Sequence, residues 1–151
     1  VEGAVGLQYD LLNDLSEQEL VDCDVDNGGC EGGIFTSPLN YIETYGISLY
    51  DDYPYRAVVG TCLADNTRRA AAIVSFVGVS SCDVVATQIA LQEIGPLSVS
   101  IDASCETFMY YSGGVFDVGC GAVNNNHAVA LVGYNTDPNN EWGVSYWIAK
   151  N

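Results

Sequence analysis

Basic side chains are scarce in this sequence. Arg56, Arg68, Arg69 and Lys150 are the only arginines and lysines, against 20 acidic residues, so the net charge is −16. An electrostatic field of that sign repels nucleic acid and anionic lipid, so we expect neither as a partner. The charge suits an acidic compartment or a salty exterior, although solubility alone explains it equally well.

Features that identify several other classes of protein are also missing. No apolar run approaches the ~20 residues that a membrane-spanning helix needs, so we expect no membrane span. The first residues lack a basic start and a cleavage site of small residues, so no signal peptide is predicted. No Asn-X-Ser/Thr acceptor occurs, so N-glycosylation of this chain is not expected.

The six cysteines are poorly spaced for a metal site. No Cys-X-X-Cys occurs, and the closest two cysteines in the sequence are Cys23 and Cys30. We therefore predict no zinc site and no other metal or cofactor. Six cysteines in an ordinary globular composition instead favour a compartment in which disulfides form. A lysosome, a vacuole or the outside of the cell would each fit.

The first half of the chain reads as helical. Residues 1–10 resemble the end of a helix, and Ser16 can cap a second helix, with Glu19 returning to the cap amide as a capping box. Residues 26–38 contain several glycines and read as a loop. A short amphipathic helix is predicted over residues 38–46, and Gly46 ends it. Its apolar face is expected to hold Leu39, Ile42 and Tyr45.

The second half of the chain favours strands, and the change of character lies near Gly78. Period-two alternation and flanking turn residues predict five strands, at residues 70–80, 96–103, 113–121, 127–135 and 142–151. Residues 83–95 predict a helix between the first two. The fold class is therefore α+β, in two lobes and with no internal repeat.

Seven segments, in this order, resemble the papain-like cysteine proteases. They are LSEQELVDCD (15–24), GCEGG (29–33), YGISLYDDYPY (45–55), IGPLSVSIDA (94–103), Phe108 with YYSGGVF (110–116), HAVALVGY (127–134) and YWIAKN (146–151). The resemblance implies a helical lobe over residues 1–78 and an antiparallel, barrel-like β lobe over residues 79–151. The active site would lie in the cleft between them. It also implies that the first lobe is incomplete at its N-terminus and the second at its C-terminus.

His127 and Asn151 match two members of the catalytic triad of that family. The nucleophilic cysteine of the family lies in a Cys-Gly-[Ser/Ala]-Cys-[Trp/Tyr] motif, about 130 to 150 residues before the histidine and asparagine. No such motif occurs in this sequence, so the nucleophile is expected upstream of Val1. By resemblance, His127 would be the general acid and base and Asn151 would orient its ring. Their alternative roles are a structural histidine and an asparagine in a turn.

The resemblance also implies a substrate-binding surface. Gly32 and Gly33 match a glycine pair whose extended backbone pairs with the substrate, at a place where a Cβ would obstruct the approach. Asn126 stands where some relatives have aspartate. The main specificity pocket would be lined by Ile34, Phe35, Ser100, Asn125 and Ala128. The two apolar residues favour an apolar side chain two residues before the scissile bond.

Disulfide assignments follow from the same resemblance. Cys23 and Cys62 match a disulfide of the helical lobe. Cys30 and Cys120 match positions whose partners would lie outside the chain. The family pattern does not include Cys82 and Cys105, and we predict that these two pair with each other, two buried thiols being the alternative.

The function implied is that of a cysteine endopeptidase, with polypeptide substrates and no cofactor. A separate propeptide and cystatin-type inhibitors are expected as further partners, and the protein is expected to be a monomer. One alternative is an inactive homologue that acts as a binding or structural protein. The other is a transferase or ligase variant with the same triad and a different acyl acceptor.

Overall fold

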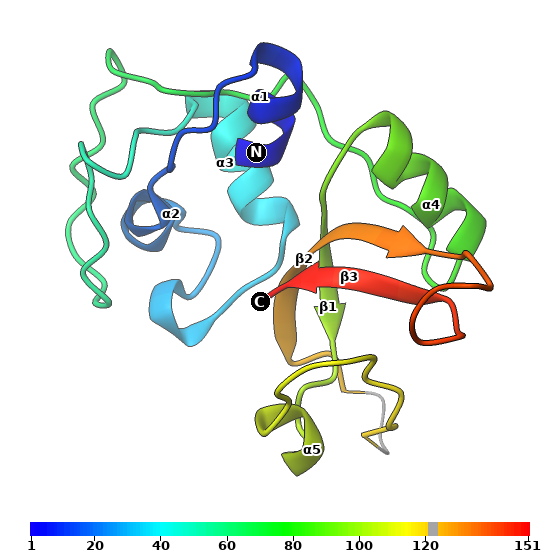
Figure 1. The fold of residues 1–151 in the computed structure, drawn as a ribbon. Coiled ribbons are helices and arrows are strands. Elements are labelled where there is room, and N and C mark those ends of the chain that lie inside the picture. Colours follow the sequence, from blue (N-terminus) through cyan, green and yellow to red (C-terminus); the bar gives the residue numbers. More distant parts are fainter. Residues whose placement is uncertain (121–123) are drawn as a thin grey trace. The chain divides into compact units, whose positions relative to one another are not determined.

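A computed structural model describes residues 1–120 and 124–151, which form two compact units, residues 1–78 and 79–151 (Figure 1). The first unit contains three α-helices, α1 (Glu2–Tyr9), α2 (Glu17–Cys23) and α3 (Thr36–Tyr45), and the short 3₁₀ helix η1 (Gly29–Glu31). Its core is the buried cluster of Leu15, Ile42 and Ile47. None of the helices described is long and apolar enough to span a membrane.

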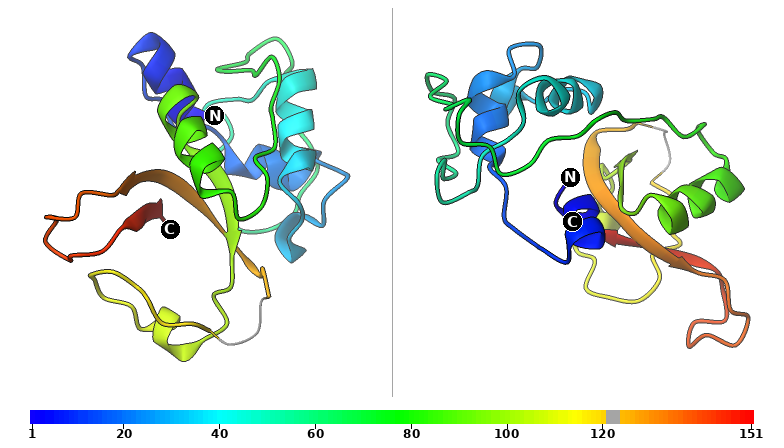
Figure 2. Two further views of the ribbon diagram at one scale, coloured as in Figure 1. Left: turned by 90° about the vertical axis from the view of Figure 1, so that its right-hand side faces the viewer. Right: turned by 90° about the horizontal axis from the view of Figure 1, so that it is seen from above.

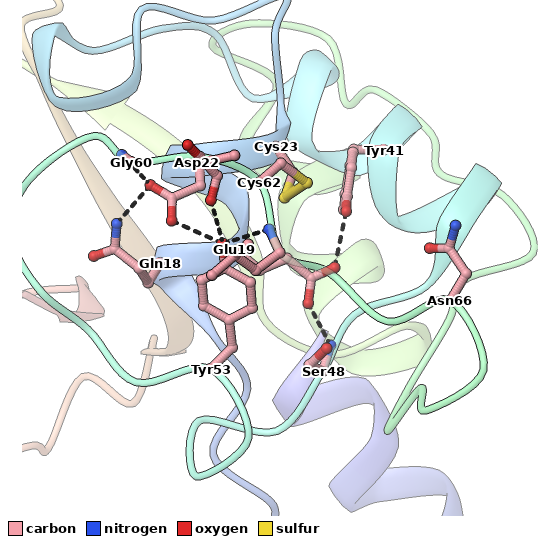
Figure 3. Close-up of a disulfide and its surroundings, with 12 residues drawn as sticks. Gln18, Glu19, Asp22, Cys23, Tyr41, Ser48, Tyr53, Gly60, Cys62 and Asn66 are labelled. Carbon is pink, nitrogen blue, oxygen red and sulfur yellow. Dashed lines mark hydrogen bonds between the residues drawn. A yellow bond between two sulfur atoms is a disulfide. The ribbon is translucent and has the colours of Figure 1, made fainter.

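The start of α2 is only partly as predicted. The Ser16 Oγ accepts a hydrogen bond from the Glu19 backbone N–H at 2.9 Å, so the N-cap is confirmed. The predicted return bond from the Ser16 N–H to the Glu19 side chain is wrong, because the Ser16 N–H donates to the Ser48 carbonyl instead. The Glu19 carboxylate is buried and accepts bonds from the Ser48 N–H and the Tyr41 hydroxyl, each at 2.9 Å (Figure 3). It also accepts a bond from Arg69.

A second buried carboxylate of α2 organises the neighbouring loop. Asp22 Oδ1 accepts from Gln18 Nε2 at 2.9 Å and from the Gly60 N–H at 2.7 Å, and Oδ2 accepts from the Tyr53 hydroxyl at 2.8 Å (Figure 3). Oδ2 also accepts from Arg56. Burial raises the pKa of Asp22, but these donors outweigh it and hold the pKa below its ordinary value. One ionised side chain therefore fastens α2 to residues 53–60.

Helix α3 begins two residues earlier than predicted, at Thr36, and ends at Gly46, whose φ of 72° favours glycine. Ile42 is buried as expected and Leu39 is half-buried, but Tyr45 is 52% exposed. The Tyr45 ring packs beside Tyr41 with centroids 5.2 Å apart. Its place on the core face was therefore a wrong prediction.

The second unit is built on an antiparallel sheet in the order β1 (Leu97–Ile101), β2 (His127–Asn135), β3 (Tyr146–Lys150). The helix α4 (Val84–Glu93) packs against β2, as Figures 1 and 2 show. Asp83 caps α4 by accepting from the Ala86 N–H at 2.9 Å. Ala90 of α4 and Val129 and Leu131 of β2 are buried. A short helix, α5 (Glu106–Met109), follows β1.

Two predicted strands do not form. Residues 70–80 make only an isolated bridge between Ala71 and Ile47, and Val74 is 93% exposed, because no neighbouring strand pairs with the rest of the alternating pattern. In the predicted strand 113–121, residues 113–120 form no strand, and Gly121 lies outside the described residues. Gly113 and Gly114 have φ of 154° and 86°, which turns the chain at that point.

One of the two disulfides pairs as predicted and the other does not. The Cys23–Cys62 disulfide is present as expected, but Cys105 bonds Cys120, so the Cys82–Cys105 pair and an outside partner for Cys120 are both wrong. The Cα atoms of Cys105 and Cys120 are 5.0 Å apart, and a bonded sulfur has no second bond for Cys82. Cys30 and Cys82 are exposed and free within the described chain, and an outside partner for Cys30 stays a prediction.

The Cys23–Cys62 disulfide is expected to stabilise the first unit, because it closes a loop with a sequence separation of 39 residues. Replacing both cysteines by serine should lower the free energy of unfolding by about 2 to 4 kcal/mol. Urea unfolding of the double variant and of wild type measures the difference. Single serine replacement of the exposed Cys82 is the control and should change little. Equal stability of all three proteins would contradict the assignment.

Candidate active site

His127 is the first residue of β2, and the sheet fixes its backbone. It is paired with Ile101 at the end of β1, and the preceding Asn126 N–H donates to the Ile101 carbonyl at 3.1 Å. The Asn126 Oδ1 accepts from the Ala103 N–H at 3.0 Å. Both bonds hold the approach to β2 against the segment that leaves β1, so the histidine has a defined position.

The Asp102 carboxylate makes a second connection between the segment after β1 and the segment before β2. The Asp102 carboxylate accepts from the Ser104 N–H at 3.0 Å, from the Ser104 hydroxyl, and from the Asn124 N–H at 3.3 Å. The hydrogen bonds from Ser104, strongest among the causes, hold the pKa of Asp102 below its ordinary value. An ionised Asp102 thus ties the segment after β1 to the segment that leads into His127.

The imidazole of His127 meets the side chain that follows β3. Strand β3 pairs with β2 up to Lys150, opposite Ala130, and Asn151 comes next. The distance from His127 Nε2 to Asn151 Oδ1 is 2.6 Å. Because a carboxamide oxygen only accepts, this contact requires the proton on Nε2. The other nitrogen, Nδ1, has no hydrogen-bond partner among the described residues and remains available to take or give a proton.

The aromatic ring of Phe108, for which the sequence predicted no role, lies near the imidazole of His127. The Phe108 ring, on α5, stands edge-on to His127 with centroids 6.3 Å apart, and its other edge-on neighbour is Phe116 at 5.5 Å. Such pairs favour one ring orientation. Phe108 lies within one of the motifs quoted above, but the sequence carried no signal that its ring would reach His127.

Four further candidates lie near this histidine in the second unit. Ser100 and Ala128 face each other directly across β1 and β2, and both are exposed, so the sheet brings these two together. Asn125 is exposed. Asn126 is exposed too, but its carboxamide oxygen is already bonded to Ala103, which leaves its NH₂ group for other partners.

The other four candidates form one continuous segment of the first unit. Gly32 ends η1 with φ of 97°, and open space surrounds the place of a Cβ, so its backbone conformation explains the glycine. At Gly33 a Cβ would overlap the Asn27 carboxamide, so a neighbouring side chain explains the second one. Ile34 is 67% exposed, and Phe35 is half-buried directly before α3.

Metal chemistry has no visible basis at these residues. Across residues 1–120 and 124–151, no group of three or more His, Cys, Asp and Glu side chains is placed to hold a metal ion. The arrangement is instead an imidazole with a carboxamide on one nitrogen and a free second nitrogen, which is suited to proton transfer beside a nucleophile.

Comparison with known proteins identifies the fold and the family. A digestive procathepsin L 3 from Tenebrio molitor larval midgut has a TM-score of 0.89 and 37% identity, over 99% of this chain and 49% of that chain. The cysteine endopeptidase Rep1 of Oryza sativa subsp. japonica is 43% identical over all of this chain and 40% of its own length. Cathepsin K of Mus musculus is 39% identical, with 100% and 45% covered.

The chain thus spans less than half the length of these relatives, and the fold is the papain-like one that the sequence motifs predicted. The family model for papain family cysteine proteases matches residues 1–151. The chain belongs to the papain family of cysteine proteases.

Proposed function

We propose that the protein containing this chain is a cysteine endopeptidase that uses His127 as general acid and base and Asn151 as the group that orients it. The observation that carries the proposal is the 2.6 Å contact between His127 Nε2 and Asn151 Oδ1. That contact leaves Nδ1 for the nucleophile, which would be a cysteine of the segment preceding Val1. Family membership supports the chemistry.

The reaction would have two stages. A cysteine thiolate attacks the carbonyl carbon of the scissile peptide bond, and a thioester forms when the carbon–nitrogen bond breaks. The proton on Nδ1 goes to the departing amine. Neutral Nδ1 then takes a proton from water as that water attacks the thioester, which releases the acid and regenerates the thiolate–imidazolium pair. Asn151 keeps the proton of Nε2 in place throughout.

The substrates we propose are extended polypeptides. The Gly32–Gly33 backbone would pair with such a chain as an added strand, and Ile34 and Phe35 would favour an apolar side chain two residues before the scissile bond. Ser100 and Ala128, directly opposite each other, would line the specificity pocket with Asn125, and Asn126 would contact the substrate beside His127. We place the protein in a lysosome, a vacuole or outside the cell, since its two disulfides need an oxidising compartment.

Further partners are part of the proposal. One matching structure is of a procathepsin, which supports an inhibitory propeptide for this protein as well. Cystatin-type inhibitors and a monomeric state follow from family membership alone.

Peptide cleavage by the full-length protein tests the function. We expect an internal bond of an unfolded polypeptide to be cut, and stoichiometric alkylation of one thiol by iodoacetamide to stop the reaction. Cleavage with unchanged rate after alkylation would contradict a cysteine mechanism. A protein that cleaves no polypeptide even before alkylation would indicate an inactive homologue. Transfer of the acyl group to an added amine in preference to water would indicate the transferase variant.

The orienting role of Asn151 predicts a defined loss of activity. Asn151→Ala removes the acceptor of the Nε2 proton, so the ring can rotate and Nδ1 leaves its productive position. We expect kcat/KM to fall on the order of 10²-fold. Asn139→Ala, in the exposed loop between β2 and β3, is the matched control and should keep wild-type activity. A variant at position 151 with unchanged kcat/KM would remove the asparagine from the mechanism.

A further inference from the structure

The side chain of Asn27 makes an unusual set of contacts with the backbone of Ile34. Its Oδ1 accepts from the Ile34 N–H at 2.9 Å, and its Nδ2 donates to the Ile34 carbonyl at 3.2 Å. A carboxamide carries a donor NH₂ beside an acceptor oxygen, so it can pair with a backbone N–H and C=O as a neighbouring strand would. Asn27 thus takes up both backbone groups of the residue that follows Gly33.

The Asn27 side chain is itself held by a buried carboxylate. Its Nδ2 also donates to Asp24 Oδ2 at 3.0 Å, and the other oxygen of Asp24 accepts from the hydroxyl of Ser37. Asp24 and Ser37 are both buried, the first at the end of α2 and the second in the first turn of α3. The chain of bonds therefore connects Ile34 to two helices.

The position of the Asn27 side chain also explains why residue 33 is glycine. A Cβ on Gly33 would overlap the Asn27 carboxamide, whereas nothing lies within 4 Å of the corresponding place on Gly32. A second bond, from the Gly28 N–H to the Gly32 carbonyl at 2.9 Å, closes the other side of the loop. Residues 32–34 are thus held on both sides by groups that are not themselves part of the segment.

We propose that Asn27 is a positioning residue that sets the conformation of the Gly32–Ile34 backbone for substrate. This inference rests on the proposed function, because it assumes that this backbone pairs with an extended peptide. By occupying both backbone groups of Ile34, the carboxamide leaves those of Gly33 as the ones free to face a substrate. The loss of Asn27 would then weaken binding of long substrates and leave the bond-breaking chemistry intact.

The test compares Asn27→Asp with wild type in the full-length protein, on two substrates. Aspartate has the same shape and keeps the acceptor for Ile34 N–H, but it loses the donor to the Ile34 carbonyl and to Asp24. For a hexapeptide substrate we expect KM to rise about tenfold, with kcat changed less than twofold. The displaced Gly33 backbone would bind the substrate more weakly in the bound state and in the reacting state alike. For a minimal ester of one acylated amino acid, which does not reach residues 32–34, neither constant should change.

Controls separate this role from simple destabilisation. Asn40→Asp, the same change on an exposed residue of α3, should match wild type on both substrates. Urea unfolding of Asn27→Asp reports whether the unit has lost stability. An equal loss on both substrates, or no loss on the hexapeptide, would overturn the proposal. A wild-type protein that cleaves neither substrate would instead contradict the proposed function.

Discussion

His127→Ala in the full-length protein is expected to lower kcat/KM for a peptide substrate by roughly 10³- to 10⁴-fold. The variant removes the only histidine of the chain, and with it both proton transfers and the positive charge that stabilises a thiolate. The loss should appear mainly in kcat, since the imidazole acts on the reacting atoms and contributes little to binding the rest of the substrate. Steady-state hydrolysis of a fluorogenic peptide measures both constants.

A control on the same strand shows whether the loss is chemical. Val132→Ala changes an exposed side chain five residues further along β2, and its kinetics should stay within twofold of wild type. If His127→Ala retained wild-type kcat, or if Val132→Ala lost as much activity, the catalytic role of this imidazole would be refuted.

Asp22→Asn is expected to destabilise the protein by roughly 3 kcal/mol at neutral pH. The Asp22 side chain is completely shielded from solvent, and it accepts four hydrogen bonds, one of them from Arg56. The amide keeps one acceptor oxygen but presents donors to groups that also donate, so buried donors lose their partner. Breaking one side of a buried ion pair typically costs about 3 to 5 kcal/mol, and the partial exposure of Arg56 favours the lower figure.

The contribution of Asp22 should depend on pH in a defined direction. The folded protein holds the pKa of Asp22 below 3.8, the ordinary value for the unfolded chain, so folding favours the ionised form. The stabilisation is therefore fully present above about pH 4 to 5 and is lost as the pH falls through the lower, folded pKa. The difference between wild type and Asp22→Asn should shrink below pH 4. Urea unfolding between pH 3 and pH 7, with the reactive thiol blocked, measures it.

Asp52→Asn is the matched control for that series. Asp52 pairs with Arg68 at 3.0 Å on the surface of the same unit, and the Arg68 side chain is 67% exposed. Exposed pairs of this kind contribute about 0 to 1 kcal/mol. A loss at position 52 equal to the loss at position 22, or a difference for Asp22 that grows as the pH falls, would contradict the account of this cluster.

Local signals in the sequence predicted the frame of the site well. Alternation over residues 127–135 predicted β2 with its observed bounds, and the Ser16 cap predicted the start of α2. These features depend on near neighbours in the sequence, which a short stretch of residues records. The pairing of His127 with Asn151 came from resemblance to a family, since the two are 24 residues apart and meet only because β3 returns beside β2.

The wrong predictions share a dependence on distant partners. Glu19 has the spacing of a capping box, yet Ser48, Tyr41 and Arg69, none of them near it in the sequence, take up its carboxylate. Residues 70–80 alternate as a strand would, but only Ala71 has a bridge partner, Ile47, so no ladder forms. The Asn27 contact was missed for the same reason, because spacing alone does not show that a carboxamide seven residues away lies against Ile34.

The pH dependence of thiol alkylation tests the central claim most directly. In the full-length protein, a cysteine paired with His127 should be a thiolate well below the ordinary cysteine pKa of about 8.5, and iodoacetamide should label it rapidly at pH 5 to 6. In His127→Ala, labelling at that pH should become slow and should rise only as the pH approaches 8.5. Identical pH profiles for the two proteins would contradict the pairing of this imidazole with a nucleophilic sulfur.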